Sequence, residues 1–417
     1  MRSQSELAGA VSGLSLKKYQ LPGWLGSLGP AFMVSIAYID PGNFAANIAA
    51  GSAFGYRLLW VIVWSNLMAI FLQVLSAKLG IAAGKSLPAC CVQFFPRPAR
   101  WLLGGIAVTA AMATDLTEFL GAALGMHLLL GWPLGCCGLI AGFISFLLLL
   151  WGGRRQRAVE LAVVFLLGVV GVAYLLELLL AEPGWVEAAK GALCPSLPAG
   201  SAYLVVGMLG ATVMPHVIFL HSQLVQPCHF GSGEKENFLR LRQEKINVAL
   251  AMNLAMAVNL AMVIMAAAVF YRNGISVTTL EEAHFTLAPL LGPLSSVFFG
   301  IALLAAGFSS AIVGTLAGQL IMEGFTGVRL PAGLSRLLTM APAMLIIASG
   351  TEVMYALLAS QIVLSLALPA VVVPLLLLTG SRRVMGGMVN SPVVQGLGWL
   401  IAALVCGLDV YWLAGLF

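Results

Sequence analysis

A short polar cluster, Asp40-Pro41-Gly42-Asn43, interrupts the first long apolar stretch of the chain. A charged side chain at mid-membrane costs roughly 2.5–3.5 kcal/mol, so its presence there points to a function. Pro41 has no backbone N–H, and the carbonyl oxygen of Ala37, four residues earlier, therefore loses its helical partner. The carboxylate, the Asn43 side-chain oxygen and this carbonyl are ligands that suit divalent cations. The cluster predicts a broken helix with a cation site; a kink that holds a structural aspartate is the alternative.

A second interruption occurs at Met214-Pro215, in a later apolar stretch. By the same rule, Pro215 frees the carbonyl oxygen of Ala211. Met214 places a thioether beside that carbonyl, and a soft sulfur ligand favours later first-row metals over Mg2+ or Ca2+. Taken alone, Met214 is more typical of a core or lipid-facing position. Together with the first break, it becomes a candidate metal ligand.

The elements that must position these residues are membrane helices. Of the 417 residues, 60% are hydrophobic and 9% are charged, whereas soluble domains carry about 25% charged residues. Long apolar runs recur along the whole chain, each able to cross a hydrocarbon core of about 30 Å. They predict eleven spans, at residues 24–53, 57–82, 101–131, 133–151, 157–181, 199–225, 244–272, 286–325, 334–350, 352–379 and 391–416. The first, third and eighth spans are long enough to require tilt or a break.

The two breaks occupy the first and sixth spans, which are corresponding positions of two five-span groups. Such a pair is typical of transporters built from inverted repeats, with the site at the midplane. We therefore expect an all-α polytopic membrane protein with a cytoplasmic tail (1–23), two inverted five-helix repeats (24–181 and 199–379) and an eleventh, accessory helix (391–417).

The distribution of basic residues predicts the orientation. With a cytoplasmic N-terminus and an external C-terminus, all Lys and Arg residues except Arg57, Lys190 and Arg272 fall in cytoplasmic segments, as the positive-inside rule requires. The predicted location is the cell membrane, the inner membrane where there are two. Because the basic residues are scattered through short loops, they do not indicate nucleic-acid binding.

Two carboxylates lie within the predicted third span. Asp115 and Glu118 are three residues apart and share a helix face. Two carboxylates this close in a low dielectric cannot both be ionised without a large cost, which suits a proton carrier. A structural pair, satisfied by hydroxyl groups or by an arginine such as Arg336, is the alternative. Arg336 itself fits either a loop charge or a partner of this pair.

Four further polar side chains lie in apolar spans. His216 and His221 follow the second break, and they fit either a proton path or satisfied core positions. Asn259 and Gln361 are amides that could reach the cation site or bridge two helices. The residues alone do not decide between these readings.

The two break motifs, Asp40-Pro41-Gly42-Asn43 and Met214-Pro215-His216, resemble the paired signature of the Nramp family of divalent-metal transporters. The resemblance runs nearly end to end. It also includes Ser65-Asn66-Leu67-Met68, Leu75-Ser76-Ala77-Lys78-Leu79-Gly80, Ala113-Thr114-Asp115-Leu116, Gly314-Thr315-Leu316-Ala317-Gly318-Gln319 and Ser360-Gln361-Ile362-Val363-Leu364-Ser365 with Leu368-Pro369.

This resemblance implies a LeuT-type fold and proton-linked import of Mn2+ or Fe2+ by alternating access, without a resident cofactor and as a functional monomer. It implies metal ligation by Asp40, Asn43, Met214 and the carbonyls of Ala37 and Ala211, and by Gln361 in some conformations. Family positions linked to proton movement or gating are matched by Thr114, Asp115, Glu118, His216, His221, Asn259 and Arg336.

Three positions depart from the usual family pattern. Phe308 stands where the eighth span usually has Gln, Val217-Ile218-Phe219 replaces Asn-Leu-Tyr, and Asp409 replaces Asn. The ligands remain intact, so the departures concern the lining of the vestibules. The related magnesium-transporting branch is expected to lack the methionine, and Met214 argues against it.

Other functions fit the residues less well. A Na+-coupled carrier of organic substrates would not place an aspartate and a thioether at its two breaks. A membrane-embedded hydrolase would need a motif such as GxSxG or HExxH, and the sequence has neither. A channel would show a filter-like repeat, which is also missing. The sequence therefore indicates a transporter, not an enzyme.

Overall fold

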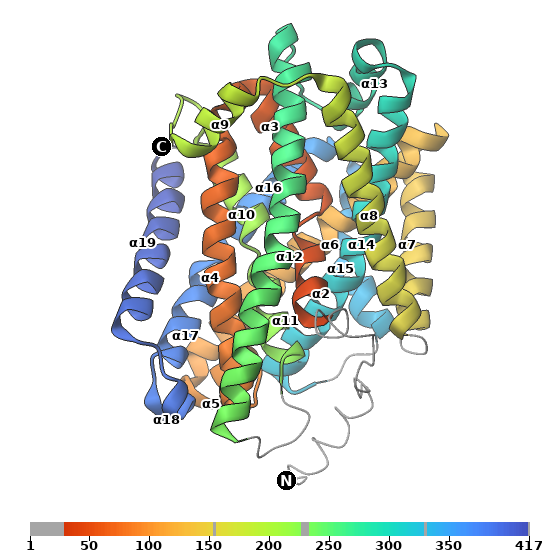
Figure 1. The fold of residues 1–417 in the computed structure, drawn as a ribbon. Coiled ribbons are helices and arrows are strands. Elements are labelled where there is room, and N and C mark those ends of the chain that lie inside the picture. Colours follow the sequence, from red (N-terminus) through yellow and green to blue (C-terminus); the bar gives the residue numbers. More distant parts are fainter. Residues whose placement is uncertain (1–28, 153–155, 227–232, 329–331, 416–417) are drawn as a thin grey trace.

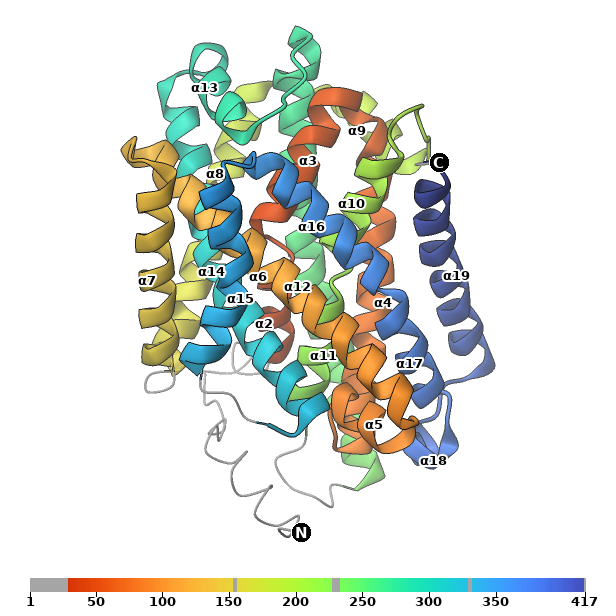
Figure 2. The ribbon, with the colours of Figure 1, turned by 180° about the vertical axis from the view of Figure 1, so that it is seen from behind.

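The computed structural model describes residues 29–152, 156–226, 233–328 and 332–415, and over these residues it contains helices and no strands. The side chains of residues 148–163 and 332–339 lie outside this description. The helices stand roughly side by side in a bundle, with short helices at both ends (Figures 1 and 2).

Eight helical stretches among the described residues are long and apolar enough to cross a membrane, and Leu134–Leu147 and Met340–Ser349 are shorter apolar helices. One stretch, Pro41–Ala83, contains two helices joined by a 3-10 turn where the chain reverses (Figure 1). Each of the eleven predicted spans therefore coincides with one helix or with an interrupted pair. The helices that form single spans are α4 (Leu59–Ala83), α6 (Arg97–Leu130), α7 (Leu134–Gly152), α8 (Gln156–Ala181), α12 (Glu234–Val269), α14 (Pro293–Thr326), α15 (Ala332–Ser349) and α19 (Pro392–Ala414).

The first and sixth spans are both broken, as predicted. The first consists of α2 (Gly29–Ala37) and α3 (Pro41–Phe54), and the sixth of α10 (Ala202–Thr212) and α11 (Pro215–Leu224). In each pair a proline opens the second half-helix, where its missing N–H costs nothing. Nearly every residue of α3, α10 and α11 is buried, so these half-helices form the centre of the bundle.

For three of the predicted spans, the structure shows whether the helix is continuous or divided. The third, α6, is one uninterrupted helix of 34 residues. The eighth is divided: α13 (Leu280–Leu291) ends at Gly292, whose φ of 98° suits glycine, before α14 begins. The tenth consists of α16 (Val353–Ala367) and α17 (Pro369–Thr379), because Pro369 cannot bond to the Ser365 carbonyl and the Leu368 N–H takes that acceptor at 2.9 Å.

Short helices cover the ends of the bundle. They are α5 (Leu87–Phe94), α9 (Trp185–Leu193), α18 (Arg382–Met385) and the 3-10 turns η3 (Gly55–Leu58), η4 (Tyr271–Asn273) and η5 (Gly386–Met388). The helices α9 and α13 lie at one end of the bundle, and α5 and α18 lie at the other (Figures 1 and 2). The turns that carry Arg57 and Arg272 and the helix that carries Lys190 are at the α9 end.

Glycines allow the central helices to approach closely. A Cβ added at Gly210 of α10 would meet the backbone of Gln361 and Ser365 in α16. A Cβ at Gly42 would meet the Gln361 side chain, and one at Gly121 of α6 would meet the Pro41 ring. Both broken helices are therefore held against their neighbours at backbone distance.

We predict that Gly210→Ala lowers the melting temperature of the purified protein in detergent. The added methyl group has backbone rather than a flexible side chain in its way, and overpacking of this kind costs about 1–3 kcal/mol. Gly207→Ala is the matched control, because it lies in the same helix with open space around its Cα. Equal melting temperatures for the two variants would show that α10 and α16 are not in contact as described.

Candidate metal centre

The first break brings the two predicted side-chain ligands together. Asp40 is the N-cap of α3, and its Oδ1 accepts hydrogen bonds at 2.8 Å from both the backbone N–H and the side-chain Nδ2 of Asn43. Such a cap satisfies N–H groups that a helix start leaves unpaired. The carboxylate is completely buried, and it is held by the same half-helix whose proline created the break.

The Asn43 amide links the two breaks. Its Nδ2 lies 2.8 Å from Asp40 Oδ1, 3.0 Å from the carbonyl oxygen of Ala211 and 3.2 Å from that of Tyr38. Ala211 is the residue whose carbonyl Pro215 leaves without a helical partner. Two oxygen atoms from the unwound segment of the first span and one from α10 thus surround one donor nitrogen, as they would surround a cation.

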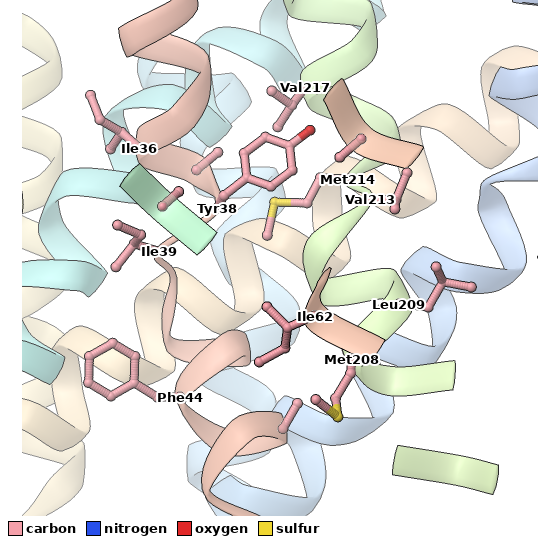
Figure 3. Packing of buried hydrophobic residues seen from close by; sticks show 14 of the residues in the cluster. Ile36, Tyr38, Ile39, Phe44, Ile62, Met208, Leu209, Val213, Met214 and Val217 are labelled. Carbon is pink, nitrogen blue, oxygen red and sulfur yellow. The ribbon is translucent and has the colours of Figure 1, made fainter. Parts of the chain in front are cut away.

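Met214 lies between α10 and α11, and its side chain is completely buried. Figure 3 shows that Met214 and Tyr38 point into the same space between the two breaks. The thioether thus lies on the short unwound segment, and the Ala211 carbonyl lies in the last turn of α10 just before it. Ala37 ends α2 on the opposite segment, and Pro41 cannot supply its carbonyl with a partner.

Gln361 of α16 reaches the first break from a third direction. Its side-chain amide lies directly over Gly42, where any larger residue would collide with it. Gln361 is completely buried, and its Oε1 makes no hydrogen bond with any residue that the structure describes. The amide nitrogen is the Gln361 atom nearest to Gly42, and the unpaired oxygen belongs to the same buried amide group.

Asn259 of α12 supports the unwound segment of the first break. Its Nδ2 donates to the Tyr38 carbonyl at 2.8 Å, and its Oδ1 accepts from Asn47 Nδ2 at 2.8 Å. Tyr38 O therefore receives amide groups from both Asn43 and Asn259. The sequence left open whether Asn259 reaches the cation site or bridges two helices. In the structure Asn259 lies beside the first break and also between α12 and α3.

Two threonines of α6 lie between Asp40 and His216, and the hydroxyl of one bonds to the backbone carbonyl of the other. Thr117 Oγ1 lies 3.4 Å from Asp40 Oδ2 and 2.7 Å from the Thr114 carbonyl. Thr114 Oγ1 in turn lies 3.0 Å from His216 Nδ1, and either atom can supply the hydrogen. The His216 ring is completely buried and faces α6, the predicted third span.

Both predicted carboxylates of α6 are buried, Asp115 at 1% and Glu118 at 0% exposure. The Glu118 carboxylate lies against Gly314 of α14, where an added Cβ would displace it. The side chain of Arg336 lies outside the described residues.

His221 belongs to a separate network. Its Nδ1 lies 2.9 Å from Gln73 Oε1 and its Nε2 lies 3.0 Å from Glu244 Oε1. Gln73 Nε2 donates to the Tyr38 hydroxyl at 2.8 Å, so the chain of contacts runs from the first break to α12. Both ring nitrogens therefore face oxygen atoms of neighbouring side chains.

Sequence reasoning missed four contributors to these networks, namely Tyr38, Gln73, Thr117 and Glu244. A buried Gln in the apolar second span was a usable signal, since amides are costly there unless bonded. Thr117 lies between the two carboxylates that were singled out and could have been included with them. The contribution of the Tyr38 backbone carbonyl leaves no trace in a side-chain pattern.

The centre is sealed in this conformation, because Asp40, Asn43, Met214 and Gln361 are each at most 1% exposed. Within the described part of the chain there is no group of three or more His, Cys, Asp and Glu side chains that could hold a metal ion. The donors gathered at the breaks are instead one carboxylate, two amides, carbonyl oxygens and a thioether. This mixture fits a hard-to-borderline divalent ion better than a zinc site of the Cys and His type.

Comparisons with known proteins show the family and the fold. The family model described as "Natural resistance-associated macrophage protein-like" (Nramp) matches residues 31–415. The divalent metal cation transporter MntH of Clostridium acetobutylicum is 51% identical over 391 residues, which cover 94% of this chain and 91% of the relative.

Solved structures show the same fold. A manganese transporter of Eremococcus coleocola, in complex with an aromatic bis-isothiourea substituted compound, superposes with a TM-score of 0.83 at 31% identity, covering 94% of this chain and 87% of the other. Mhp1, a nucleobase-cation-symport-1 family transporter in a closed conformation, gives a TM-score of 0.62 at 17% identity over 94% and 92% of the two chains, which shows the fold alone. The predicted LeuT-type architecture is confirmed, and the chain is a multi-pass membrane protein that belongs to the Nramp family.

Proposed function

We propose that this protein imports divalent transition-metal ions, Mn2+ and Fe2+ among them, across the cell membrane by proton-coupled alternating access. The observation that carries the proposal is the convergence of Asp40 Oδ1 and the Tyr38 and Ala211 carbonyl oxygens on one donor, Asn43 Nδ2. Relatives that match over nine-tenths of the chain are named as divalent metal cation transporters.

Ion binding requires a change in the Asn43 amide. The nitrogen that now bonds to Asp40 Oδ1 carries two hydrogens and has no lone pair for a metal. Rotation of the amide by half a turn presents its oxygen to the ion and releases the carboxylate and the Ala211 carbonyl. The proposed ligands are Asp40, Asn43, Met214 and the carbonyls of Ala37 and Ala211, with Gln361 joining from α16.

A buried site must open to each side in turn. Because none of the side-chain donors has appreciable exposed surface, an ion reaches them only when the half-helices move relative to their neighbours. We propose that the repeats at 24–181 and 199–379 move in this way. The basic residues favour a cytoplasmic N-terminus, with the α9 and α13 end outside, and one chain holds the complete site, so a monomer suffices.

Asp40→Ala is expected to abolish Mn2+ transport, because it removes the only charged donor at the two breaks. Influx into proteoliposomes is followed with an enclosed metal-quenched dye, and gel filtration checks that the variant remains monodisperse. Glu187→Gln, an exposed carboxylate in α9, is the control and should behave like the wild type. Near wild-type influx in Asp40→Ala would refute the site.

We expect Met214→Ala to retain Mn2+ transport at reduced affinity while Ca2+ and Mg2+ begin to compete, since the soft ligand is lost and the oxygen donors remain. Met208→Ala is the matched control: it removes a completely buried thioether from α10, before the break. Competition by Ca2+ is measured as the concentration that halves Mn2+ influx. If this concentration is unchanged in Met214→Ala, sulfur does not select the ion.

Protons are proposed to leave through α6. A bound dication at Asp40 repels a proton. Thr117 of α6 contacts Asp40 and Thr114 contacts His216, and Asp115 and Glu118 are buried carboxylates of the same helix. Glu118→Gln should keep Mn2+ binding in calorimetry but carry fewer protons per ion, recorded as internal acidification alongside influx. An unchanged ratio of protons to metal would exclude this route and make Asp40 itself the proton carrier.

A further inference from the structure

A buried acidic group lies apart from the metal centre, in the last turns of α8. Glu177 is completely buried, and neither of its carboxyl oxygens makes a hydrogen bond with any described residue. Tyr174, three residues earlier on the same helix face, is 1% exposed, and its hydroxyl has no partner among those residues either. Buried polar atoms are almost always paired, so two adjacent exceptions need an explanation.

Few charged groups face Glu177. The helices packed against α8 are α2, α7, α12, α13 and α14. In their described parts at the α9 and α13 end, α2, α12 and α14 carry no ionisable side chain, and α7 carries only the thiols Cys136 and Cys137. The described parts of these four helices therefore bring no lysine or arginine to Glu177 at this end.

The helix α13 contributes the remaining titratable groups. Glu281 and Glu282 lie in its first turn, where Thr278 N–H and hydroxyl groups bond to the Glu282 carboxylate and lower the pKa of Glu282. Burial lowers the pKa of His284, and its Nδ1 has no hydrogen-bond partner in the described chain. Burial thus favours the uncharged form of the His284 ring over the charged form.

An aromatic contact joins Tyr174, the neighbour of this acid on α8, to the helix that carries Asn43. The Phe44 ring meets the Tyr174 ring edge-on, with centroids 5.3 Å apart, and the Phe299 ring at 6.3 Å. Phe44 directly follows Asn43 in α3, and in Figure 3 its ring lies apart from the Met214 side chain. Any movement of α3 that rearranges the metal ligands on this side must also move the ring that covers Tyr174.

We propose that Glu177, with Tyr174 beside it, is a proton-binding site on the α9 and α13 side of the metal centre, closed by Phe44; this rests on the proposed transport function. An isolated carboxylate is too costly to bury, so the closed state holds the neutral acid. When α3 moves and water enters, the acid gives its proton to water and becomes a carboxylate. In the reverse step a hydronium ion returns the proton and leaves a water molecule.

The test compares Glu177→Gln with the wild type in proteoliposomes, with the pH varied on the α9 and α13 side. Glutamine copies the shape and neutrality of the protonated acid but cannot exchange the proton. Mn2+ influx in the variant should therefore persist to higher pH, with the half-maximal point raised by about one unit. Glu187→Gln, on the same side but exposed, should leave that point unchanged.

A second measurement does not depend on transport. The infrared difference spectrum between low and high pH should lose one protonated-carboxyl band in Glu177→Gln, and Glu177→Asp should shift that band if the glutamine variant does not fold. A pH profile and an infrared spectrum that both match the wild type would overturn the proton site and leave the transport function standing. Absence of Mn2+ influx in the wild type would refute the transport function instead, with the infrared result still deciding about Glu177.

Discussion

The structure depends on two missing N–H groups. Pro41 and Pro215 each stop a helix inside the bundle, and each leaves a carbonyl oxygen without the partner that an unbroken helix supplies. In a membrane such groups are tolerated only where protein or a cavity surrounds them. Nearly all the polar side chains at the centre can be understood as a response: Asp40 caps the new helix start, and Asn43 and Asn259 donate to carbonyls of the unwound segments.

Two polar networks leave this centre in different directions. One follows the hydroxyls of α6 from Asp40 to His216, and the other follows the Tyr38 hydroxyl through Gln73 to His221 and Glu244. The two histidines are five residues apart on α11, yet they serve different networks because α11 passes between α6 and α4. One half-helix therefore touches both, and its movement would alter both together.

Much of this architecture was predictable because membranes impose simple rules. Apolar length gave the spans, and proline next to a polar residue at depth gave both breaks. A break in the eighth span was one of the two outcomes expected from its length, and it occurs at Gly292. The interruption at Pro369 was hidden in a continuous apolar run. The partners of His221 could not be predicted, because they come from two other helices and depend on packing that no local pattern records. The carbonyl of Tyr38 carries no side-chain signal at all.

The Asn43 amide has a consequence for selectivity. The Asn43 amide holds Asp40 and the Ala211 carbonyl by internal hydrogen bonds. At the proposed metal site, an incoming ion must therefore displace a side chain of the protein as well as lose its own hydration shell. This competition sets a minimum binding free energy for the ion. Ions that bind oxygen and sulfur ligands together displace the amide, whereas ions with a high cost of dehydration leave it in place. Selection between ions thus begins with the free energy needed to displace the Asn43 amide from its hydrogen bonds.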